Sequence, residues 1–141
     1  MNNTMATFGY PATLIKEYTH WCVLLRPVQV TLGSLVLACK DPAQRFSAIT
    51  ADAFAEQATV VADIERVLGE FMQFEKMNYM MLMMVDPDVH YHVLPRYEGS
   101  RSHGGSEFLD AGWPALPRLD APTETSADFN AALVSTLRDL W

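Results

Sequence analysis

The sequence is poor in cysteine and in positive charge. Only two of its 141 residues are cysteines, Cys22 and Cys39, and both lie inside apolar runs. Two cysteines are too few for a disulfide framework, so we predict two buried thiols in a protein of the reducing cytoplasm. Ten Lys and Arg stand against seventeen Asp and Glu, a formal charge of −7. This acidic balance argues against nucleic acid or an anionic membrane as a partner.

Long hydrophobic runs are also absent. The longest apolar stretches, such as 80–85, are far shorter than the ~20 residues that a bilayer span needs. The first nine residues are polar and do not show the basic and then apolar pattern of a secretory signal, so no targeting segment is expected. Half of the residues are nevertheless hydrophobic and 11% are aromatic, which is too rich for a disordered chain. The length and composition predict a single folded domain over 1–141.

The order of apolar runs and turn residues predicts an α+β fold with an antiparallel sheet. A long helix is expected to begin after Thr50, a plausible N-cap, and to bury a stripe of apolar residues at helical spacing. That stripe consists of Phe54, Val61, Ile64, Leu68 and Phe71. Strands are expected at 21–25, 34–39, 78–85 and 89–94, helices at 11–18, 51–74 and 126–140, and a loop at 99–106.

One of these strands is unusual because it holds four methionines in five positions, at 80, 81, 83 and 84. Such a run is consistent with a soft-metal tract or with an adaptable binding surface. It is also typical of a short, fully buried strand that ends at Asp86-Pro87, and this is the interpretation that we favour.

The segment 88–96 carries the most chemical information. Because side chains alternate between the faces of a strand, Val89, Tyr91 and Val93 are expected to face the core. Asp88, His90 and His92 then form a row on the opposite face. Successive members of the row are about 7 Å apart at a rise of ~3.3 Å per residue, so two imidazoles can reach neighbouring atoms of one ligand.

Three interpretations of this row remain open from the residues alone. The row can be the exposed polar face of an edge strand. It can be a metal site, with His90 and His92 as nitrogen ligands, Asp88 as an oxygen ligand, and His20 or His103 as a further ligand. It can also serve covalent catalysis, since neutral imidazole is a good nucleophile at phosphorus and is abundant at neutral pH.

The run from His90 to Arg96, which reads His-Tyr-His-Val-Leu-Pro-Arg, resembles the signature of the histidine triad (HIT) superfamily. That signature is His-φ-His-φ-His-φ-φ, where φ is apolar, and Pro-Arg often follows it. The elements upstream are similar to the family as well, so that the resemblance covers about 21–97. It is greatest to the branch that contains dinucleoside polyphosphate hydrolases. It implies a HIT-like α+β fold with an antiparallel sheet of about five strands, one long helix and a C-terminal helix.

The resemblance also implies chemistry. His90 matches the histidine that attacks the α-phosphorus to form a nucleotidyl-histidine, and its other ring nitrogen should donate to a backbone carbonyl. His92 matches the histidine that assists at the phosphate oxygens and the leaving group. From their positions near this strand, and not from the resemblance, Arg96, which supplies local positive charge, Asn78 and Asp88 are candidate substrate contacts. The family implies a homodimer and a nucleotide or dinucleoside polyphosphate as ligand, and we expect no cofactor.

The sequence departs from the family pattern at two places. Asp88 occupies the position of the first histidine, where a carboxylate would repel a polyphosphate or orient a neighbouring histidine. Only residues 85–87 precede it where the family commonly has a polar Gly-Gln loop. The leading hypothesis is therefore a HIT-type hydrolase or transferase. The alternatives are a non-catalytic nucleotide-binding protein on the same fold and a metal-dependent enzyme. Residues 98–141 are expected to form a C-terminal extension around the core.

Overall fold

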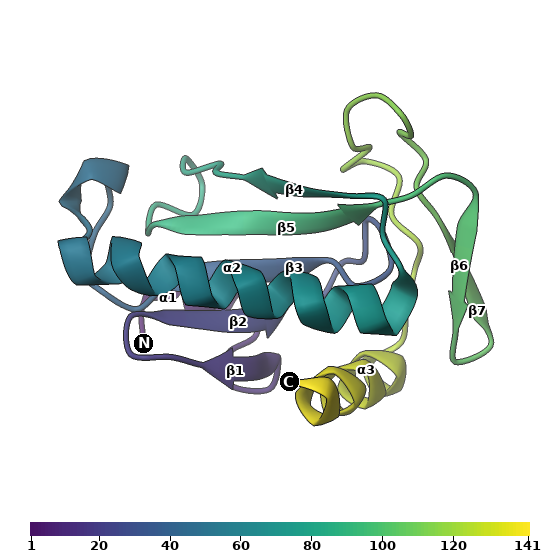
Figure 1. Cartoon of the computed structure of the whole chain (residues 1–141), viewed down its shortest axis with the longest axis horizontal. Helices are drawn as coiled ribbons and strands as arrows, with labels where there is room; N and C mark the ends of the chain where they lie inside the picture. Colours follow the sequence, from purple (N-terminus) through teal and green to yellow (C-terminus); the bar gives the residue numbers. More distant parts are fainter.

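A five-stranded antiparallel sheet forms the centre of the computed structural model, which describes all 141 residues (Figure 1). The strands lie in the order β1-β2-β3-β5-β4, with one long helix, α2, across one face. The sheet contains β1 (Leu14–Glu17), β2 (Trp21–Leu25), β3 (Leu35–Cys39), β4 (Lys76–Met80) and β5 (His90–Arg96). The predicted fold class is confirmed.

The strand with the two histidines, β5, lies between β3 and β4 and is not an edge strand. Its residue His90 is paired with Ala38 of β3, and His92 is paired with Val36. The alternation predicted for this strand is confirmed, since Val89 and Val93 belong to the main core. The histidines point to the opposite face and are also buried, so the interpretation as an exposed polar edge is wrong.

Helix α2 (Ala51–Met72) supplies the core on the first face of the sheet. Its N-cap is Thr50, as predicted, whose side chain accepts a hydrogen bond from the backbone N–H of Ala53. The predicted apolar stripe is partly wrong, because Phe54 is 42% exposed and the buried face is rotated away from it. The buried residues are Ala53, Val60, Ile64, Val67, Leu68 and Met72. The face of the helix that is buried is therefore decided by its contacts with the sheet, and not by which stripe of the sequence is the most hydrophobic.

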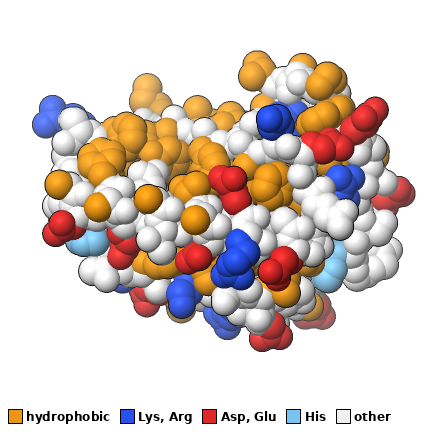
Figure 2. Space-filling model, in the orientation of Figure 1, with side chains coloured by type: hydrophobic (Ala, Val, Ile, Leu, Met, Phe, Trp, Pro, Cys, Tyr) orange, Lys and Arg blue, Asp and Glu red, His pale blue; other side chains and the backbone are white.

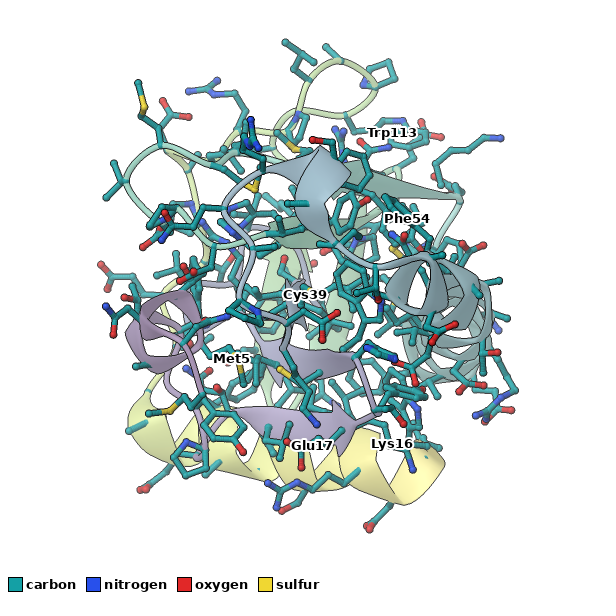
Figure 3. The ribbon with its side chains drawn as sticks, turned by 90° about the vertical axis from the view of Figure 1, so that its left-hand side faces the viewer. Met5, Lys16, Glu17, Cys39, Phe54 and Trp113 are labelled. Atoms are coloured by element: carbon teal, nitrogen blue, oxygen red, sulfur yellow. The ribbon has the colours of Figure 1, made fainter.

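The short helix α1 (Asn3–Thr7) lies on the second face of the sheet, opposite α2. The side view places Met5 of α1 and Phe54 of α2 on opposite sides of the strands (Figure 3). Met5 forms a second, smaller core with alternate residues of β2 and β3: Cys22, Leu24, Val36 and Ala38. Both faces of the sheet are therefore covered, which explains why β2 and β3 are buried along their whole length.

The N-terminal helix predicted at 11–18 is wrong. Residues Leu14–Glu17 form strand β1, which is antiparallel to β2 and has an irregularity in register between Leu14 and Lys16. The helix at this end of the chain is α1, which precedes the strand. The spacing of Leu14, Ile15 and Tyr18 suits a helix, but the backbone groups are satisfied by a neighbouring strand that local spacing does not show.

The strand predicted at 78–85 is also wrong in its second half. β4 ends at Met80, and it is a half-buried edge strand and not a fully buried one. Residues 81–85 form a loop in which Met84 and Val85 are 89% and 91% exposed. The apolar run continues past the end of β4 as part of the connection to β5, which is the antiparallel neighbour of β4 in the sheet.

The C-terminal segment packs onto the same core as the sheet. Residues 99–106, predicted as a loop, instead contribute to a two-stranded hairpin of β6 (Ser100–His103) and β7 (Ser106–Leu109). The predicted last helix is confirmed as α3 (Ala127–Leu140), with Ser126 as its N-cap. It lies beside β1 (Figure 1), and Leu133, Val134 and Leu137 join the main core.

A 3₁₀ turn, η1 (Phe46–Ala48), precedes α2. None of the helices combines the length and apolar character needed to cross a membrane.

Candidate active site

His90 is held in one orientation by the backbone of its own strand. Its ring nitrogen Nδ1 lies 2.6 Å from the carbonyl oxygen of Asp88. A carbonyl oxygen only accepts, so Nδ1 must carry a proton, and in the neutral ring the free lone pair is then on Nε2. This is the carbonyl partner that the family resemblance implies. Nε2 is fully buried and has no hydrogen-bond partner. The imidazole is therefore in the tautomer that a nucleophile requires.

His92 lies next to His90 on the same face, with ring centroids 5.2 Å apart. Its Nδ1 accepts from the Nε–H of Arg26 at 3.4 Å. Because a guanidinium has only donors, Nδ1 of His92 is unprotonated and Nε2 carries the proton. The pair therefore offers complementary groups: a lone pair on His90 and an N–H donor on His92.

Burial lowers the pKa of His92 from 6.5 to about 4, and the positive charge of Arg26 adds to this effect, as does the neighbouring His90. His92 is consequently a neutral donor at pH 7. In the unfolded chain the same group binds a proton near its ordinary pKa. The unfolded state therefore takes up the proton first, and His92 reduces the stability of the fold as the pH falls from 6.5 toward 4.

Replacing Arg26 by glutamine should raise the pKa of His92, since the nearby positive charge is removed. The value should stay below 6.5 because burial, the larger cause, remains. A histidine NMR titration of the wild-type protein and the variant measures this change. Arg118→Gln is the matched control, because Arg118 is exposed and pairs with Asp120 instead. An unchanged His92 titration in Arg26→Gln would show that the guanidinium does not act on the ring.

Asp88 does not point its carboxylate at either histidine. Its Oδ2 accepts from the backbone N–H of Thr4 at 3.3 Å and from the Thr4 hydroxyl at 3.0 Å. The backbone N–H of Asp88 lies 3.3 Å from the same hydroxyl oxygen. Asp88 and Thr4 are 8% and 1% exposed, so this contact is buried. The side chain of Asp88 therefore fastens helix α1 to the residues just before β5, and only the carbonyl group of Asp88 orients His90.

An open cavity of about 640 Å³ lies beside His92. Its lining includes Phe8, Arg26 and His92 on one side and the methionine-rich loop 81–86 on the other. Six of its nine lining residues are hydrophobic, and Arg26 is its one cationic group. The methionine-rich loop therefore lines a cavity, and its interpretation as an adaptable binding surface stays a prediction. A ligand here would meet the guanidinium of Arg26, the imidazole of His92, the carboxylate of Asp86 and a mostly apolar wall.

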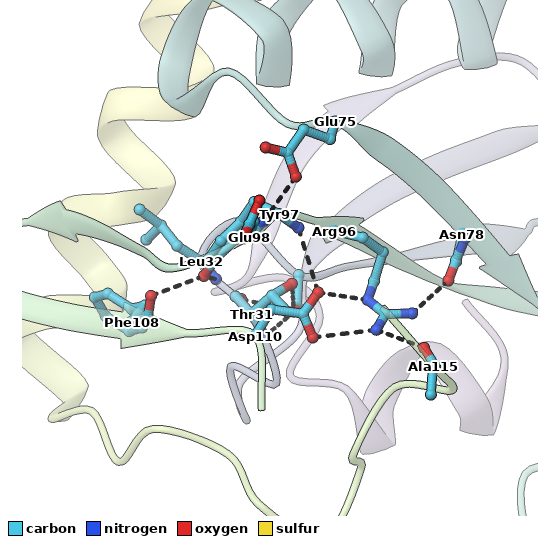
Figure 4. Close-up of polar contacts among 11 residues, drawn as sticks. Thr31, Leu32, Glu75, Asn78, Arg96, Tyr97, Glu98, Phe108, Asp110 and Ala115 are labelled. Carbon is cyan, nitrogen blue, oxygen red and sulfur yellow. Dashed lines mark hydrogen bonds and ion pairs between the residues drawn. The ribbon is translucent and has the colours of Figure 1, made fainter. Parts of the chain in front are cut away.

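Arg96 and Asn78, the other predicted substrate contacts, are not brought to the histidine pair. Figure 4 shows them in a separate group at the end of β5. Arg96 donates to both carboxylate oxygens of Asp110, to Asn78 Oδ1 at 2.8 Å and to the carbonyl oxygen of Ala115. Its ion pair with Asp110 is 2.6 Å long, and both side chains are at least 95% buried. This group ties the C-terminal segment to the sheet, beside a second cavity of about 430 Å³ that Trp113 also lines.

Sequence reasoning missed two residues of the site, Arg26 and Phe8. Arg26 follows β2 in phase with Cys22 and Leu24, which face the same side of the sheet as the histidines. Alternation along that strand was therefore a usable signal. Phe8 lies 5.7 Å from His90 and 5.6 Å from His92 between ring centroids. No local pattern predicts this contact, because it depends on where α1 docks.

The structure does not bring together the side chains that a metal site at His90 and His92 would need. No group of three or more His, Cys, Asp and Glu side chains is placed so that it could hold a metal ion. His20, a suggested further ligand, instead lies 3.2 Å from Asp41. His103 packs against Phe71 and Phe129 in the C-terminal hairpin region.

Comparison with solved structures identifies the fold class. The chain has the fold of histidine triad (HIT) proteins. A HIT protein from Sinorhizobium meliloti superposes with a TM-score of 0.76 at 15% identity, over 100% of this chain and 96% of that one. A histidine triad protein from Marinobacter aquaeolei gives 0.75 at 17% identity, over 99% and 93%.

A third structure comes from an archaeon. A hypothetical histidine triad nucleotide-binding protein from Sulfolobus tokodaii gives a TM-score of 0.71 at 16% identity, over 97% of this chain and 88% of that one. No protein-family model and no curated protein matches the sequence. The similarity is therefore carried by the arrangement of the backbone, and it confirms the HIT-like fold that the residues around His90 predicted.

Proposed function

We propose that this protein binds a nucleotide on the histidine-bearing face of the sheet and cleaves a nucleotidyl bond through a covalent intermediate on His90. The observation that carries the proposal is the tautomer of His90. Its Nδ1 is committed to the carbonyl of Asp88, which leaves Nε2 as an unprotonated nucleophile next to a neutral N–H donor. The solved structures with this fold include a protein described as nucleotide-binding, which supports the choice of ligand.

The geometry supports a two-step displacement at the α-phosphorus. Nε2 of His90 forms a bond to phosphorus as the bond to the leaving group breaks, and the leaving group departs with the electron pair. The imidazolium that results is stabilised by the carbonyl of Asp88 at Nδ1. The N–H of His92 and the guanidinium of Arg26 face the charge on the phosphate oxygens. Water then attacks phosphorus and the P–N bond breaks; the electron pair of that bond returns to Nε2 of His90, and the proton of the attacking water is released to solvent. We propose a dinucleoside polyphosphate or a related nucleotide as the substrate.

Trapping of the intermediate tests the proposal. The protein is mixed with a dinucleoside polyphosphate or a nucleoside phosphoramidate, quenched in base within the first turnover, and digested for mass spectrometry. A nucleotidyl group on the peptide that contains His90 is the expected result, because the P–N bond of a phosphohistidine survives alkaline conditions. Turnover without an adduct at His90, or an adduct on His103 instead, would contradict the proposal.

A non-catalytic nucleotide-binding protein is the second candidate. Two observations favour it. The carboxylate of Asp88 is bonded to Thr4 and does not face a ligand, and Arg26 is the single cationic group in the cavity, which is few for the stabilisation of a polyphosphate. Calorimetry with mononucleotides separates the two functions. Binding without turnover of any nucleotide supports the second, and the absence of nucleotide binding contradicts both.

We also propose that the protein is a homodimer in the cytoplasm. Strand β4 is a half-exposed edge strand, so its outer backbone groups are free to pair with another strand. Hydrophobic side chains gather over the first half of α2 and beside β4 (Figure 2). Phe46 and Phe54 are both 42% exposed there; their rings contact each other, and the Phe46 ring also contacts Tyr91. An edge strand beside exposed aromatic rings suits an interface between two copies of the chain.

Phe54→Glu should convert this dimer to a monomer, because it places a charge in the centre of the apolar surface. Light scattering at micromolar concentration should give the mass of two chains for the wild-type protein and of one chain for the variant. Glu124→Lys is a suitable control, since Glu124 is a charged residue in the C-terminal segment outside that surface. A wild-type protein with the mass of one chain would refute the dimer.

A further inference from the structure

His90 is covered in this structure, although the lone pair on its Nε2 is free. That nitrogen has no hydrogen-bond partner and no contact with solvent. The cavity of about 640 Å³ reaches Phe8 and His92 but does not reach His90. The Phe8 ring contacts both imidazoles, in a tilted arrangement with His90 and edge-on with His92. Phe8 therefore stands between the cavity and the nucleophile.

Attack at phosphorus requires Nε2 to come within about 3–3.5 Å of the reacting atom. A nitrogen without any exposed surface cannot approach a ligand that closely. The arrangement is therefore a closed state, and a group that covers His90 must move before the chemistry described above can take place. Two rings that line the cavity contact His90, those of Phe8 and His92; His92 belongs to the same strand as His90, so Phe8 is the one that can move aside.

The backbone of Phe8 is fixed more firmly than its side chain. Its N–H donates to the carbonyl of Thr4 at 3.1 Å, and its own carbonyl accepts from the Thr13 hydroxyl at 2.7 Å. Thr4 is in turn bonded to the buried carboxylate of Asp88. These contacts hold α1 and the residue that follows it against the sheet. Movement of the ring by rotation of the side chain costs less than the undocking of the helix.

Space for such a rotation exists beside the ring. A smaller cavity, of about 170 Å³, is lined by Thr7, Phe8, Arg26, Pro27 and Val28. Phe8 and Arg26 border both cavities. An apolar cavity of roughly 150 Å³ is large enough to hold a benzene ring in a protein interior. The smaller cavity beside Val28 therefore has the volume to receive the phenyl ring.

We propose that Phe8 is a side-chain gate over His90. In the closed state its ring shields Nε2 from water and ligand; in the open state the ring lies in the cavity beside Val28, and His90 joins the main cavity. The Thr4–Asp88 contact positions the gate, which gives the residue in the first triad position a role in access to the site. The purpose of the gate rests on the proposed function, but its geometry does not.

Acylation of the histidines by diethyl pyrocarbonate measures the gate directly, because the reagent is attacked by an accessible neutral imidazole nitrogen. Modification is followed at each histidine by mass spectrometry, in the wild-type protein and in Phe8→Ala and Phe8→Leu. A minor open state has a population of about 0.1–10%. Phe8→Ala should therefore accelerate modification of His90 by about ten- to a thousandfold, and Phe8→Leu, which keeps part of the cover, should have a smaller effect.

His20 and His103 are internal references, since they lie away from Phe8, and their rates should not change. Phe74→Ala is the matched control, because Phe74 is a half-buried phenylalanine after α2, on the other face of the sheet. Equal rates at His90 in wild type and both Phe8 variants would overturn the gate, as would wild-type modification of His90 as fast as that of His20. A selective rise in a protein without hydrolase activity would support the gate and count only against the proposed function.

Discussion

His90→Ala is expected to lower the rate of nucleotide cleavage by about 10⁴-fold or more, since it removes the atom that forms the bond to phosphorus. His92→Ala should have a smaller effect, about 10²- to 10³-fold, which is typical for the loss of one donor to a developing oxyanion. The two effects differ because the two rings present different atoms: a lone pair on His90 and an N–H on His92. Steady-state kinetics with the same substrate gives both numbers.

His103→Gln is the control for these variants, since His103 lies in the C-terminal hairpin and should leave turnover unchanged. Circular dichroism and thermal unfolding establish that His90→Ala is folded, which matters because the ring is fully buried. Turnover by folded His90→Ala at the wild-type rate would remove His90 from the mechanism. A reversed order, with His92→Ala the more damaging variant, would assign the nucleophile to His92.

Arg96→Met is expected to destabilise the fold by about 3–5 kcal/mol, the usual cost when one partner of a buried ion pair is removed. The variant leaves the carboxylate of Asp110, whose side chain is 1% exposed, with only the backbone N–H of Tyr97 as a donor. It also removes the bonds to Asn78 and Ala115 that hold the C-terminal segment. Equilibrium unfolding in urea measures the loss.

Arg118→Met is the matched control, because Arg118 forms a similar ion pair with Asp120 on the surface and should barely change the stability. The double variant Arg96→Met/Asp110→Leu should be more stable than Arg96→Met alone, since it no longer buries an unpaired charge. A loss in Arg96→Met no larger than in Arg118→Met would show that the Arg96 group is not a structural anchor.

Strand β5 shows what the sequence can predict. Alternation along the strand assigned Val89 and Val93 to one face and the two histidines to the other, because the period of a strand is a local property. The N-cap and length of α2 were predictable for the same reason. The sequence could not predict that β5 is a central strand, because the edge or central position of a strand is decided by pairing with segments that are distant in the chain.

The errors have the same physical origin. Residues 11–18 have helical spacing, yet β1 forms because β2 offers partners to its backbone. The methionine run has no turn residue before Asp86, so its sequence does not indicate that the sheet ends at Met80. Arg96 and Asn78 stay predicted substrate contacts, but the sequence did not indicate that Arg96 forms a buried ion pair with Asp110, because that partner belongs to a different segment of the chain.

The contact between Thr4 and Asp88 joins residues that are 84 positions apart in the chain. Closing so large a loop is entropically costly, and the cost must be met before the contact can stabilise anything. The segment 1–10 can therefore dock only after β3 and β5 have formed the surface against which Met5 and Phe8 pack. The face of the sheet with His90 is consequently covered only after β3 and β5 have paired, by a segment that precedes both strands in the chain.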